Sequence, residues 1–319
     1  MGGRSMKRTA YIVKRLVSMI FILFVASFLI FFLLRMSDVD PLSVMIGNNR
    51  ATDELKQTLT ERYNLDKPLL IQYFIWIKGV LVSDFGIDYI DGQNIRELIA
   101  SRIPVTLGLV TMSSVIGFII AIALGVISSL KIGEATDSVL SAVMLILSGT
   151  PSFLICILVL IFMTQYVPGY TFIGSYSTFG EFMQRITIPS IIMSLSFVAM
   201  LGRITRSSMI RQLQSPYIGT AQAKGLDGFS VTFKHAFHNA VIPVITAGGY
   251  MVAGAIGSTV IIEQIFSLPG IGGLLITAIQ ESNYPIIQIL VLFMLAVYLV
   301  MSFLIDILYT VLDPRVELK

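Results

Sequence analysis

The chain contains 319 residues, of which 55% are hydrophobic and only 13% are charged, and its mean hydropathy is +0.85. Soluble domains carry about 25% charged residues, so this composition excludes an ordinary soluble protein and indicates a membrane protein. The net charge of +3 is too small to indicate nucleic-acid binding, and the single Cys156 excludes an internal disulfide and argues against a cysteine-based zinc site.

Six segments are apolar and long enough to cross a hydrocarbon core of about 30 Å, which takes about 20 residues. They cover approximately residues 16–34, 105–130, 139–165, 186–201, 241–265 and 285–312. Pro151 and Pro189 lie inside the third and fourth segments, where a proline removes a backbone hydrogen bond and bends the helix. Such a bend either lines a transport path or is a tolerated feature of packing.

The ends of these segments predict how the chain is oriented. The first segment lies too far from the start and lacks a small-residue cleavage site, so we interpret it as an anchor rather than a removed signal peptide. Lys and Arg concentrate in the short loops on the side of the N-terminus. The distribution therefore predicts that both termini are cytoplasmic.

A long insert, residues 36–102, separates the first two spans on the opposite side of the membrane. Thr52 or Asp53 can cap a helix whose apolar residues recur every four positions. Residues 69–82 are apolar but too few to span and include Lys78, so they predict an interfacial or packed helix. Residues 84–94 form an acidic loop punctuated by glycine, and residues 95–106 lead into the second span.

A polar, basic loop, "YIGTAQAKGLDGFSVTFKHAFHNAVIP" (residues 217–243), lies between two strongly apolar segments. Ser215 and Pro216 are typical of a helix start, and Gly225 is typical of a left-handed helix end. The pattern predicts a short helix, a turn, and a second helix over about 229–239 on the cytoplasmic side. A helix this short is marginal in water by itself, so it needs a partner surface, and its small residues would let another backbone approach closely. On the pattern alone, an ordinary cytoplasmic loop is an equal alternative.

This loop resembles the conserved cytoplasmic loop of the permeases of binding-protein-dependent ABC importers, and its "TAQAKG" and "HAFHNAVIP" are similar to those of the peptide and nickel transporter branch. Gly219, Thr220 and Ala221 take the three positions of the family motif, and Gly225 takes the position of its fixed glycine. The resemblance extends from about Lys14 to Arg315 through "RYNLDKPLLIQY", "ELIASRIPVTL", "VIIEQIFSLPGIG" and "LIDILYTVLDPR". Gly219, Gln222 and His238 replace residues that are usually basic in the family, so this surface is less cationic than the family pattern.

The resemblance implies an all-α membrane protein of six transmembrane helices, a bundle like that of type I ABC importer permeases, with a helical extracytoplasmic insert between spans 1 and 2. It implies a non-catalytic subunit that forms half of a translocation pathway for dipeptides or oligopeptides in the cell membrane of a prokaryote. The implied partners are a second permease, two ATP-binding subunits, an external solute-binding protein and membrane lipid. No phosphate-binding loop of the form G-x-x-x-x-G-K-[ST] occurs in the chain, so ATP and Mg²⁺ would be used by the partner subunits.

The implied domain boundaries follow the spans. Residues 1–35 hold the cytoplasmic N-terminus and the first span, and 36–102 form the insert. Residues 103–314 form a five-helix permease core with a cytoplasmic coupling loop at about 203–240, and 315–319 form the tail. The insert would be the platform for the binding protein, and its acidic loop with Asp84, Asp88 and Asp91 is either part of that platform or a solvated face.

The resemblance also implies site residues, none of them catalytic or metal-binding. The residues expected to dock on an ATPase and couple its movement are Pro216, Tyr217, Gly219, Thr220, Ala221, Ala223, Lys224, Gly225, His235, Asn239 and Pro243. The candidates for the pathway or a gate are Glu263, Pro269 and Gly270. Glu263 could instead reach the interface or contact the binding protein. Asp306, inside the last span, favours a structural pair over a transport role.

Three alternatives stay open at this point. The same architecture could import nickel, a metal chelate or glutathione. A self-contained channel or secondary transporter would show inverted repeats and ionisable residues near mid-membrane, and neither is evident. An intramembrane hydrolase needs a nucleophile and base, paired Asp residues or a metal site inside the bilayer, where Asp306 is the one carboxylate well within a span. His235 and His238 share a helix face, but no carboxylate or thiol accompanies them in the sequence as a metal ligand.

Overall fold

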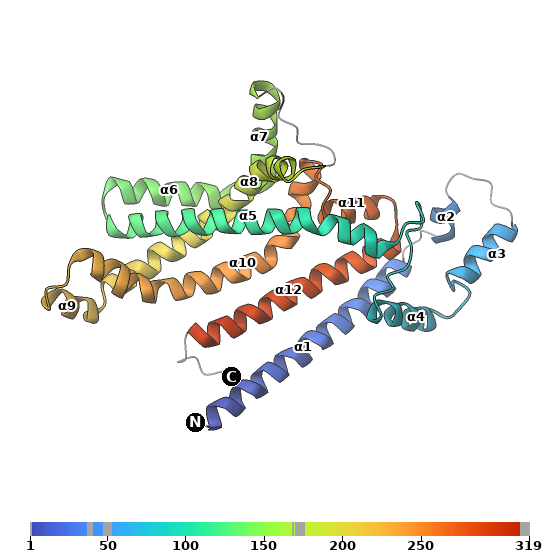
Figure 1. Cartoon of the computed structure of the whole chain (residues 1–319), viewed down its shortest axis with the longest axis horizontal. Coiled ribbons are helices and arrows are strands. Elements are labelled where there is room, and N and C mark those ends of the chain that lie inside the picture. The colour runs from blue at the N-terminus through green and yellow to red at the C-terminus, as the bar shows by residue number, and fades with distance from the viewer. Residues whose placement is uncertain (1, 37–40, 47–52, 168, 170–175, 313–319) are drawn as a thin grey trace. The chain divides into compact units, whose positions relative to one another are not determined.

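A computed structural model describes residues 2–36, 41–46, 53–167, 169 and 176–312. In the described part of the chain every regular element is helical, apart from one isolated bridge between Ile87 and Asn94 (Figure 1). The elements are α1 (Gly2–Arg35), α2 (Pro41–Ile46), α3 (Asp53–Arg62), α4 (Leu69–Leu81), α5 (Ile95–Leu130), α6 (Ala135–Gly149), α7 (Ser152–Tyr166), α8 (Phe179–Leu213), α9 (Pro216–Ala223), the π-helix η1 (Ser230–Phe237), α10 (His238–Ile265), α11 (Ile271–Gln280) and α12 (Tyr284–Leu312).

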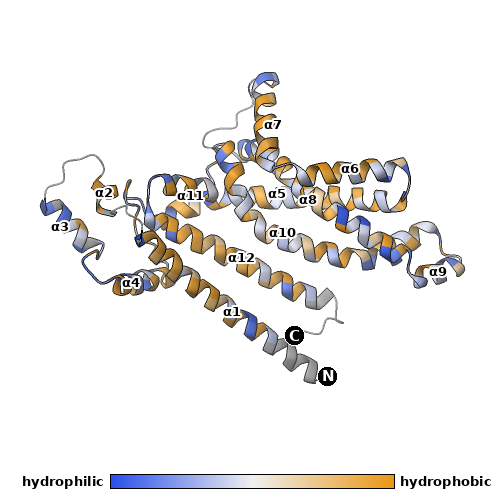
Figure 2. Cartoon of the chain, turned by 180° about the vertical axis from the view of Figure 1, so that it is seen from behind, coloured by the Kyte–Doolittle hydropathy of each residue, from blue (hydrophilic) through white to orange (hydrophobic). Residues whose placement is uncertain are grey.

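Five stretches of helix are long and apolar enough to cross a membrane, and the bent pair α6 and α7 is a possible sixth crossing. Hydrophobic residues cover α1, α7 and α12 along most of their length (Figure 2). An apolar helix surface of this kind is stable in lipid, where every backbone group is hydrogen-bonded within the helix. The prediction of a helical membrane protein is confirmed, and the predicted six spans are reached when α6 and α7 are counted as one crossing.

Several spans differ from their predicted bounds, and the second, third and fourth show why. The second helix begins at Ile95, ten residues before the predicted start, and contains Pro104 in its interior, where the proline removes one backbone hydrogen bond without ending the helix. The fourth runs over Phe179–Leu213, well beyond 186–201, since its polar ends lower hydropathy without ending the helix, and Pro189 does not break it. The predicted third span is two helices that meet at an angle of 97° next to Pro151.

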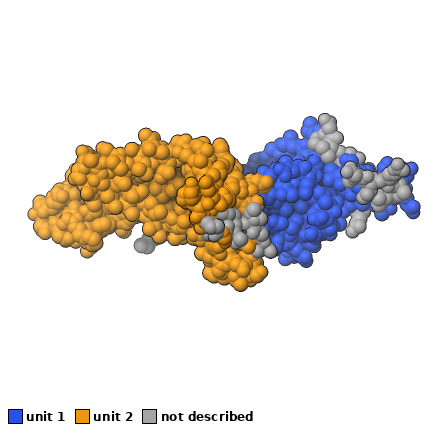
Figure 3. Space-filling view, turned by 90° about the horizontal axis from the view of Figure 1, so that it is seen from above, with its two compact units in different colours: residues 1–104, 269–299, 318 blue, residues 105–268, 300–317, 319 orange. Residues whose placement is uncertain are grey.

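The chain divides into two compact units, coloured separately in Figure 3. The first unit holds the described residues up to Pro104 together with Pro269–Leu299. The second holds Val105–Leu268 and the described residues from Val300 onward. The boundary between units therefore falls inside α5 and inside α12, a division that the sequence did not predict.

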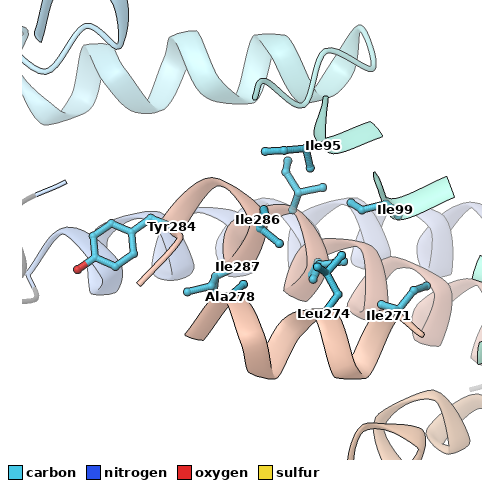
Figure 4. Close-up of a cluster of buried hydrophobic side chains, with 10 residues drawn as sticks. Ile95, Ile99, Ile271, Leu274, Ala278, Tyr284, Ile286 and Ile287 are labelled. Atoms are coloured by element: carbon cyan, nitrogen blue, oxygen red, sulfur yellow. The ribbon is translucent and has the colours of Figure 1, made fainter. Parts of the chain in front are cut away.

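The core of the first unit is formed by the starts of α5 and α12 together with α11. Figure 4 shows Ile95 and Ile99 close to the side chains of α11 and α12. The buried members of this cluster are Ile95, Ile99, Ile271, Leu274, Ala278, Tyr284, Ile286, Ile287, Ile289 and Leu290. Helix α4 packs on α1 through Tyr73, which is 1% exposed and whose hydroxyl lies 2.9 Å from Ser27 Oγ. The predicted helices at α3 and α4 are therefore present, and α4 is a packed helix.

The second unit is organised around α8, whose neighbours come close because they carry glycine. On α5, an added Cβ at Gly117 would lie 2.4 Å from Phe197 Cβ, and one at Gly125 would lie 2.7 Å from the carbonyl oxygen of Gly202. These two glycines are two turns apart on one face of α5. Small residues at such positions allow membrane helices to pack backbone to backbone.

A buried aspartate, Asp88, anchors the acidic loop of the insert. Asp88 is only 5% exposed, and its Oδ1 accepts hydrogen bonds from the Ile90 amide and from Nδ2 of Asn283, which is fully buried. Asp88 therefore cannot belong to a solvated acidic face, whereas Asp84 and Asp91 are exposed.

We expect Asn283→Ala to destabilise this unit by about 1–3 kcal/mol, because it removes a donor from a buried carboxylate. The measurement is thermal unfolding of the detergent-purified chain together with the rate of proteolysis in residues 84–94. Asp91→Ala, in the same loop but exposed, is the matched control. Equal behaviour of the two variants would show that the Asp88–Asn283 hydrogen bond does not hold the loop.

Candidate functional site

The polar loop forms the short helix that the sequence predicts. Helix α9 begins at Pro216 and ends at Ala223, and Gly225 has φ of +80°, the left-handed conformation expected of a terminating glycine. One detail differs from the prediction. The Ser215 hydroxyl does not cap the helix but donates a hydrogen bond to the carbonyl oxygen of Gln212, which ties the start of α9 to the end of α8.

One face of α9 is buried in the chain itself. Ile218 is 2% and Ala221 is 8% exposed, and both belong to a cluster of apolar side chains from α5, α8, η1 and α10. The other buried members of this cluster are Val126, Met209, Val231, Ala236 and Ala240. Because both sides of the contact are apolar, α9 is fixed to the ends of several long helices.

Polar contacts around Tyr217 add to this attachment. The Tyr217 hydroxyl lies 2.9 Å from Gln212 Oε1 and 3.3 Å from the carbonyl oxygen of His235, and it accepts a hydrogen bond from Asn239 Nδ2 at 3.3 Å. Asn239 Nδ2 also donates to the carbonyl oxygen of His235 at 3.1 Å. Three of the predicted site residues thus meet at one point, where they join α9 to η1 and α10.

The opposite face of α9 is open. Gly219, Thr220, Ala223 and Lys224 are exposed, and nothing lies within 4 Å of a Cβ built on Gly219. Three small residues of α9 were predicted to let another backbone approach. Gly219 and Ala223 lie on the exposed face and could do so, whereas Ala221 packs inward.

An exposed apolar patch, formed by Leu226, Phe229 and Phe233, follows α9 in the sequence. These residues are 41%, 71% and 42% exposed, and the two phenylalanine rings contact each other at a tilt of 37°, with centroids 4.8 Å apart. Sequence analysis missed this patch, although the two phenylalanines are four residues apart in a polar loop. Exposed aromatic residues grouped in this way are typical of a surface that binds another protein.

The turn between α9 and η1 is held by Asp227. Its Oδ2 accepts a hydrogen bond from the Ser230 amide at 3.1 Å, and the hydrogen bonds from Ser230 lower the pKa of Asp227 below its ordinary value. Asp227 therefore stays ionised at the start of η1, where a negative charge is favoured.

The predicted second helix is present, and it differs in type and length. It is a π-helix over Ser230–Phe237 that continues directly into α10, so Pro243 lies inside a long helix and is exposed. His235 is half-buried and His238 is exposed. Among the described residues no group of three His, Cys, Asp or Glu side chains lies close enough together to hold a metal ion.

A charged pair that sequence analysis did not identify joins α8 to α6, in the part of α8 that precedes α9. Arg206 Nε lies 2.6 Å from Asp137 Oδ1 and Arg206 Nη2 lies 2.7 Å from Oδ2, a bidentate contact between α8 and α6. Ser128, near the end of α5, also donates to Asp137. Bidentate pairs of this kind fix orientation as well as distance, so the ends of α5, α6 and α8 are held together.

The candidates for a gate occupy different environments. Glu263 on α10 is 0% exposed, and its Oε1 accepts a hydrogen bond from Thr106 of α5 at 2.6 Å, so within this chain its side chain presents no free surface. Pro269 and Gly270 lie in the connection between α10 and α11, where Pro269 is half-buried and Gly270 is buried. Asp306 accepts a hydrogen bond from the Tyr250 hydroxyl, which agrees with the expected structural pair.

Two sequence families match the chain. The profile described as "Binding-protein-dependent transport system inner membrane component" matches residues 116–318. The profile of the corresponding N-terminal region, "Binding-prot-dependent transport system membrane comp, N-term", matches residues 8–110.

Known proteins match over nearly the full chain. A probable peptide ABC transporter permease protein, y4tP, of Sinorhizobium fredii is 32% identical over 312 residues, which is 96% of this chain and 99% of that protein. The dipeptide transport system permease protein DppB of Lactococcus lactis subsp. cremoris is 34% identical over 310 residues, 97% of this chain and 99% of that protein. The oligopeptide transport system permease protein AppB of Bacillus subtilis is 32% identical over 314 residues, with the same two coverages.

A solved structure shares the fold. It is described as a crystal structure of an amino acid ABC transporter with histidines, and it aligns with a TM-score of 0.51 over 69% of this chain and 94% of that chain. The sequence identity is 16%, so the match shows the fold alone.

Proposed function

The chain belongs to the family of inner membrane components of binding-protein-dependent transport systems, and from this premise we propose that it forms half of a pathway through which peptides enter the cell. It is a multi-pass permease subunit with the type I permease fold. The relatives named above are described as permeases for peptides, dipeptides or oligopeptides, which supports peptides as the solute. Nickel complexes and glutathione are the alternatives to be tested.

We propose that ATP is bound and hydrolysed by separate subunits and that α9 is the contact through which they move this chain. The observation that carries this proposal is that α9 has one buried face and one exposed face. Its inner face is packed into the ends of long helices, so a displacement of α9 displaces them, whereas its outer face and the apolar patch are open. Binding of ATP can drive transport only if it favours one of two arrangements of the permease, and this contact provides the mechanical connection.

The remaining parts of the assembly follow from the same proposal. A second permease completes the pathway, and an external binding protein delivers the solute. Counting α6 and α7 as one crossing gives six spans, which supports placing both termini on the cytoplasmic side with α9. Pro269 and Gly270 are proposed to belong to a gate, and Glu263 is proposed to hold α10 against α5.

Isolation of the chain from its native membranes in a mild detergent tests the proposal. We expect mass spectrometry to identify a second permease, ATP-binding subunits and a solute-binding protein. The ligand released from that binding protein then distinguishes peptides from nickel complexes and glutathione. Recovery of this chain alone, when a control transporter retains its subunits, would contradict the proposal and favour a self-contained carrier.

We expect Phe229→Ser and Phe233→Ser each to lower the amount of ATP-binding subunit retained on the chain about tenfold. Burying a phenylalanine contributes about 1.5–3 kcal/mol, and about 1.4 kcal/mol already corresponds to a factor of ten. Phe179→Ser is the matched control, because Phe179 is 76% exposed and lies at the opposite end of α8. Unchanged retention in both patch variants would remove the apolar patch from the docking surface.

A further inference from the structure

The first unit contains two neighbouring cavities that the proposed transport function does not use. An apolar cavity of about 530 Å³ lies between α1, α4 and α12. Its lining includes Leu23, Phe24, Val80, Leu292, Phe293 and Ala296. A second cavity of about 370 Å³ lies on the same three helices and includes Arg35, Trp76 and Gln288 in its lining. Phe85 lines both cavities, so they adjoin.

The second cavity is rich in hydrogen-bond donors. Arg35 Nε donates to Gln72 Oε1 at 2.9 Å, and its guanidinium lies 4.1 Å from the centre of the Phe31 ring. Within the described part of the chain, no carboxylate lies within salt-bridge distance of Arg35. In the same part of the chain, buried Trp76 Nε1 and Gln288 Nε2 have no acceptor, and Gln288 is only 3% exposed. Donors buried without acceptors cost stability, so their presence in one cavity indicates an acceptor supplied by a ligand.

The one described carboxylate in the lining of this second cavity is Asp84, whose side chain is exposed. Its Oδ1 accepts a hydrogen bond from the Gly86 amide at 3.2 Å. The cavity thus offers a cation, neutral donors and a carboxylate at its rim. The cation and the neutral donors suit a phosphate group, and the carboxylate suits an ammonium group attached to that phosphate.

The order of the two cavities along the helices matches the shape of a lipid. Arg35 is the last residue of the span Tyr11–Arg35, and Gln288 lies in the first turns of α12, so the polar cavity is at the end of the membrane-spanning region. The apolar cavity uses residues 20–27 of α1 and 289–296 of α12, farther toward the middle of the span. At about 1.5 Å per residue, Ile20 lies about 22 Å along α1 from Arg35, which is comparable to an extended acyl chain lying along one leaflet.

We propose that these two cavities together bind one glycerophospholipid, with its phosphate at Arg35 and one acyl chain in the apolar cavity. A lipid fits better than a peptide, because the amide groups of a peptide would lose their hydrogen bonds with water in a cavity lined by hydrocarbon. The bound lipid would fill the space between α1, α4 and α12 and so join the anchor helix to the insert. This site is separate from α9 and does not depend on the proposed coupling.

The chain provides its own reporter for this site, because Trp76 is its single tryptophan. The probe is phosphatidylethanolamine with brominated acyl chains, added in small amounts to the full chain in detergent micelles. We expect saturable quenching of Trp76 fluorescence at about one lipid per chain. Diacylglycerol with the same brominated chains should need at least tenfold more for half quenching, because it lacks the phosphate.

Two variants test the two halves of the site. Arg35→Gln should weaken binding of the phospholipid at least tenfold and leave diacylglycerol unchanged. Ala296→Phe, which fills the apolar cavity without removing a donor, should weaken both, whereas Ala123→Phe at an exposed position of α5 is the matched control and should weaken neither. Inorganic phosphate should not displace the brominated lipid at millimolar concentration.

Several results would overturn the proposal. Quenching that rises without saturation, or equally with and without the phosphate, would show only general contact with lipid. Quenching unaffected by Ala296→Phe would place the acyl chain elsewhere. Displacement by inorganic phosphate would show a site for a free anion rather than for a phospholipid.

Discussion

Replacing Gly219 by tryptophan is expected to lower solute uptake at least tenfold without altering insertion or stability of the chain. Gly219 lies on the exposed face of α9, and its surroundings within this chain are empty, so the larger side chain meets nothing until a partner docks. Loss of about 1.4 kcal/mol of docking free energy gives a tenfold effect. Uptake of labelled peptide, abundance in the membrane and retention of the ATP-binding subunit are the three measurements.

Gly180→Trp is the control for this substitution, since Gly180 is an exposed glycine at the start of α8, where an added Cβ would only touch Thr178 Oγ1 at 4.0 Å. Gly219 is a better test than other positions of the loop. A large residue at Ala221 would disturb the cluster that holds α9, and Gly225→Pro would remove a hydrogen bond to Gln222 and the left-handed turn. Normal uptake by the Gly219→Trp variant would show that this face of α9 contacts no partner.

Replacing Arg206 by leucine is expected to lower the melting temperature of the chain by about 5 °C or more and to lower uptake with it. Asp137 would lose both of its charged hydrogen bonds while it remains largely buried among α5, α6 and α8. A buried charge left without its partner destabilises more than removal of the whole pair. Thermal unfolding in detergent measures the effect.

The double variant Arg206→Leu with Asp137→Leu separates this explanation from simple loss of a side chain. We expect it to melt above the Arg206→Leu variant, because no uncompensated charge is left. Arg211→Leu, at an exposed position on the same helix, should leave the melting temperature unchanged. A double variant less stable than either single variant would contradict the role given to the pair.

Most of the membrane topology could be predicted, because apolar length alone identifies a span. Helix α9 could be predicted as well, since Ser215, Pro216 and Gly225 are local signals for a start and an end. The true extent of α8 could not be predicted from hydropathy, because Arg203, Arg206 and Arg211 lower hydropathy while helix continues through them. A proline does not by itself show where a helix bends or breaks, since Pro151 coincides with a sharp bend whereas Pro189 lies within an unbroken helix.

The candidate site was less predictable than the fold because its properties depend on contacts distant in sequence. The sequence could not show that Ala221 faces inward and Gly219 outward, since that depends on how α9 packs against α5 and α8. The pairing of Asp137 with Arg206 joins residues 69 positions apart. Asp88 illustrates the same limit, because an acidic loop gives no local sign that one carboxylate is buried by Asn283.

Site-directed cross-linking from α9 tests the central claim most directly. Cys156 is the only cysteine, so a Cys156→Ala background allows a photoreactive cross-linker to be attached at Gly219→Cys or, as a control, at Gly180→Cys. After illumination of native membranes, we predict adducts between position 219 and an ATP-binding subunit, identified by mass spectrometry, and none from position 180. Adducts of position 219 only with lipid or with other copies of this chain would contradict the proposal that α9 docks on a separate ATPase.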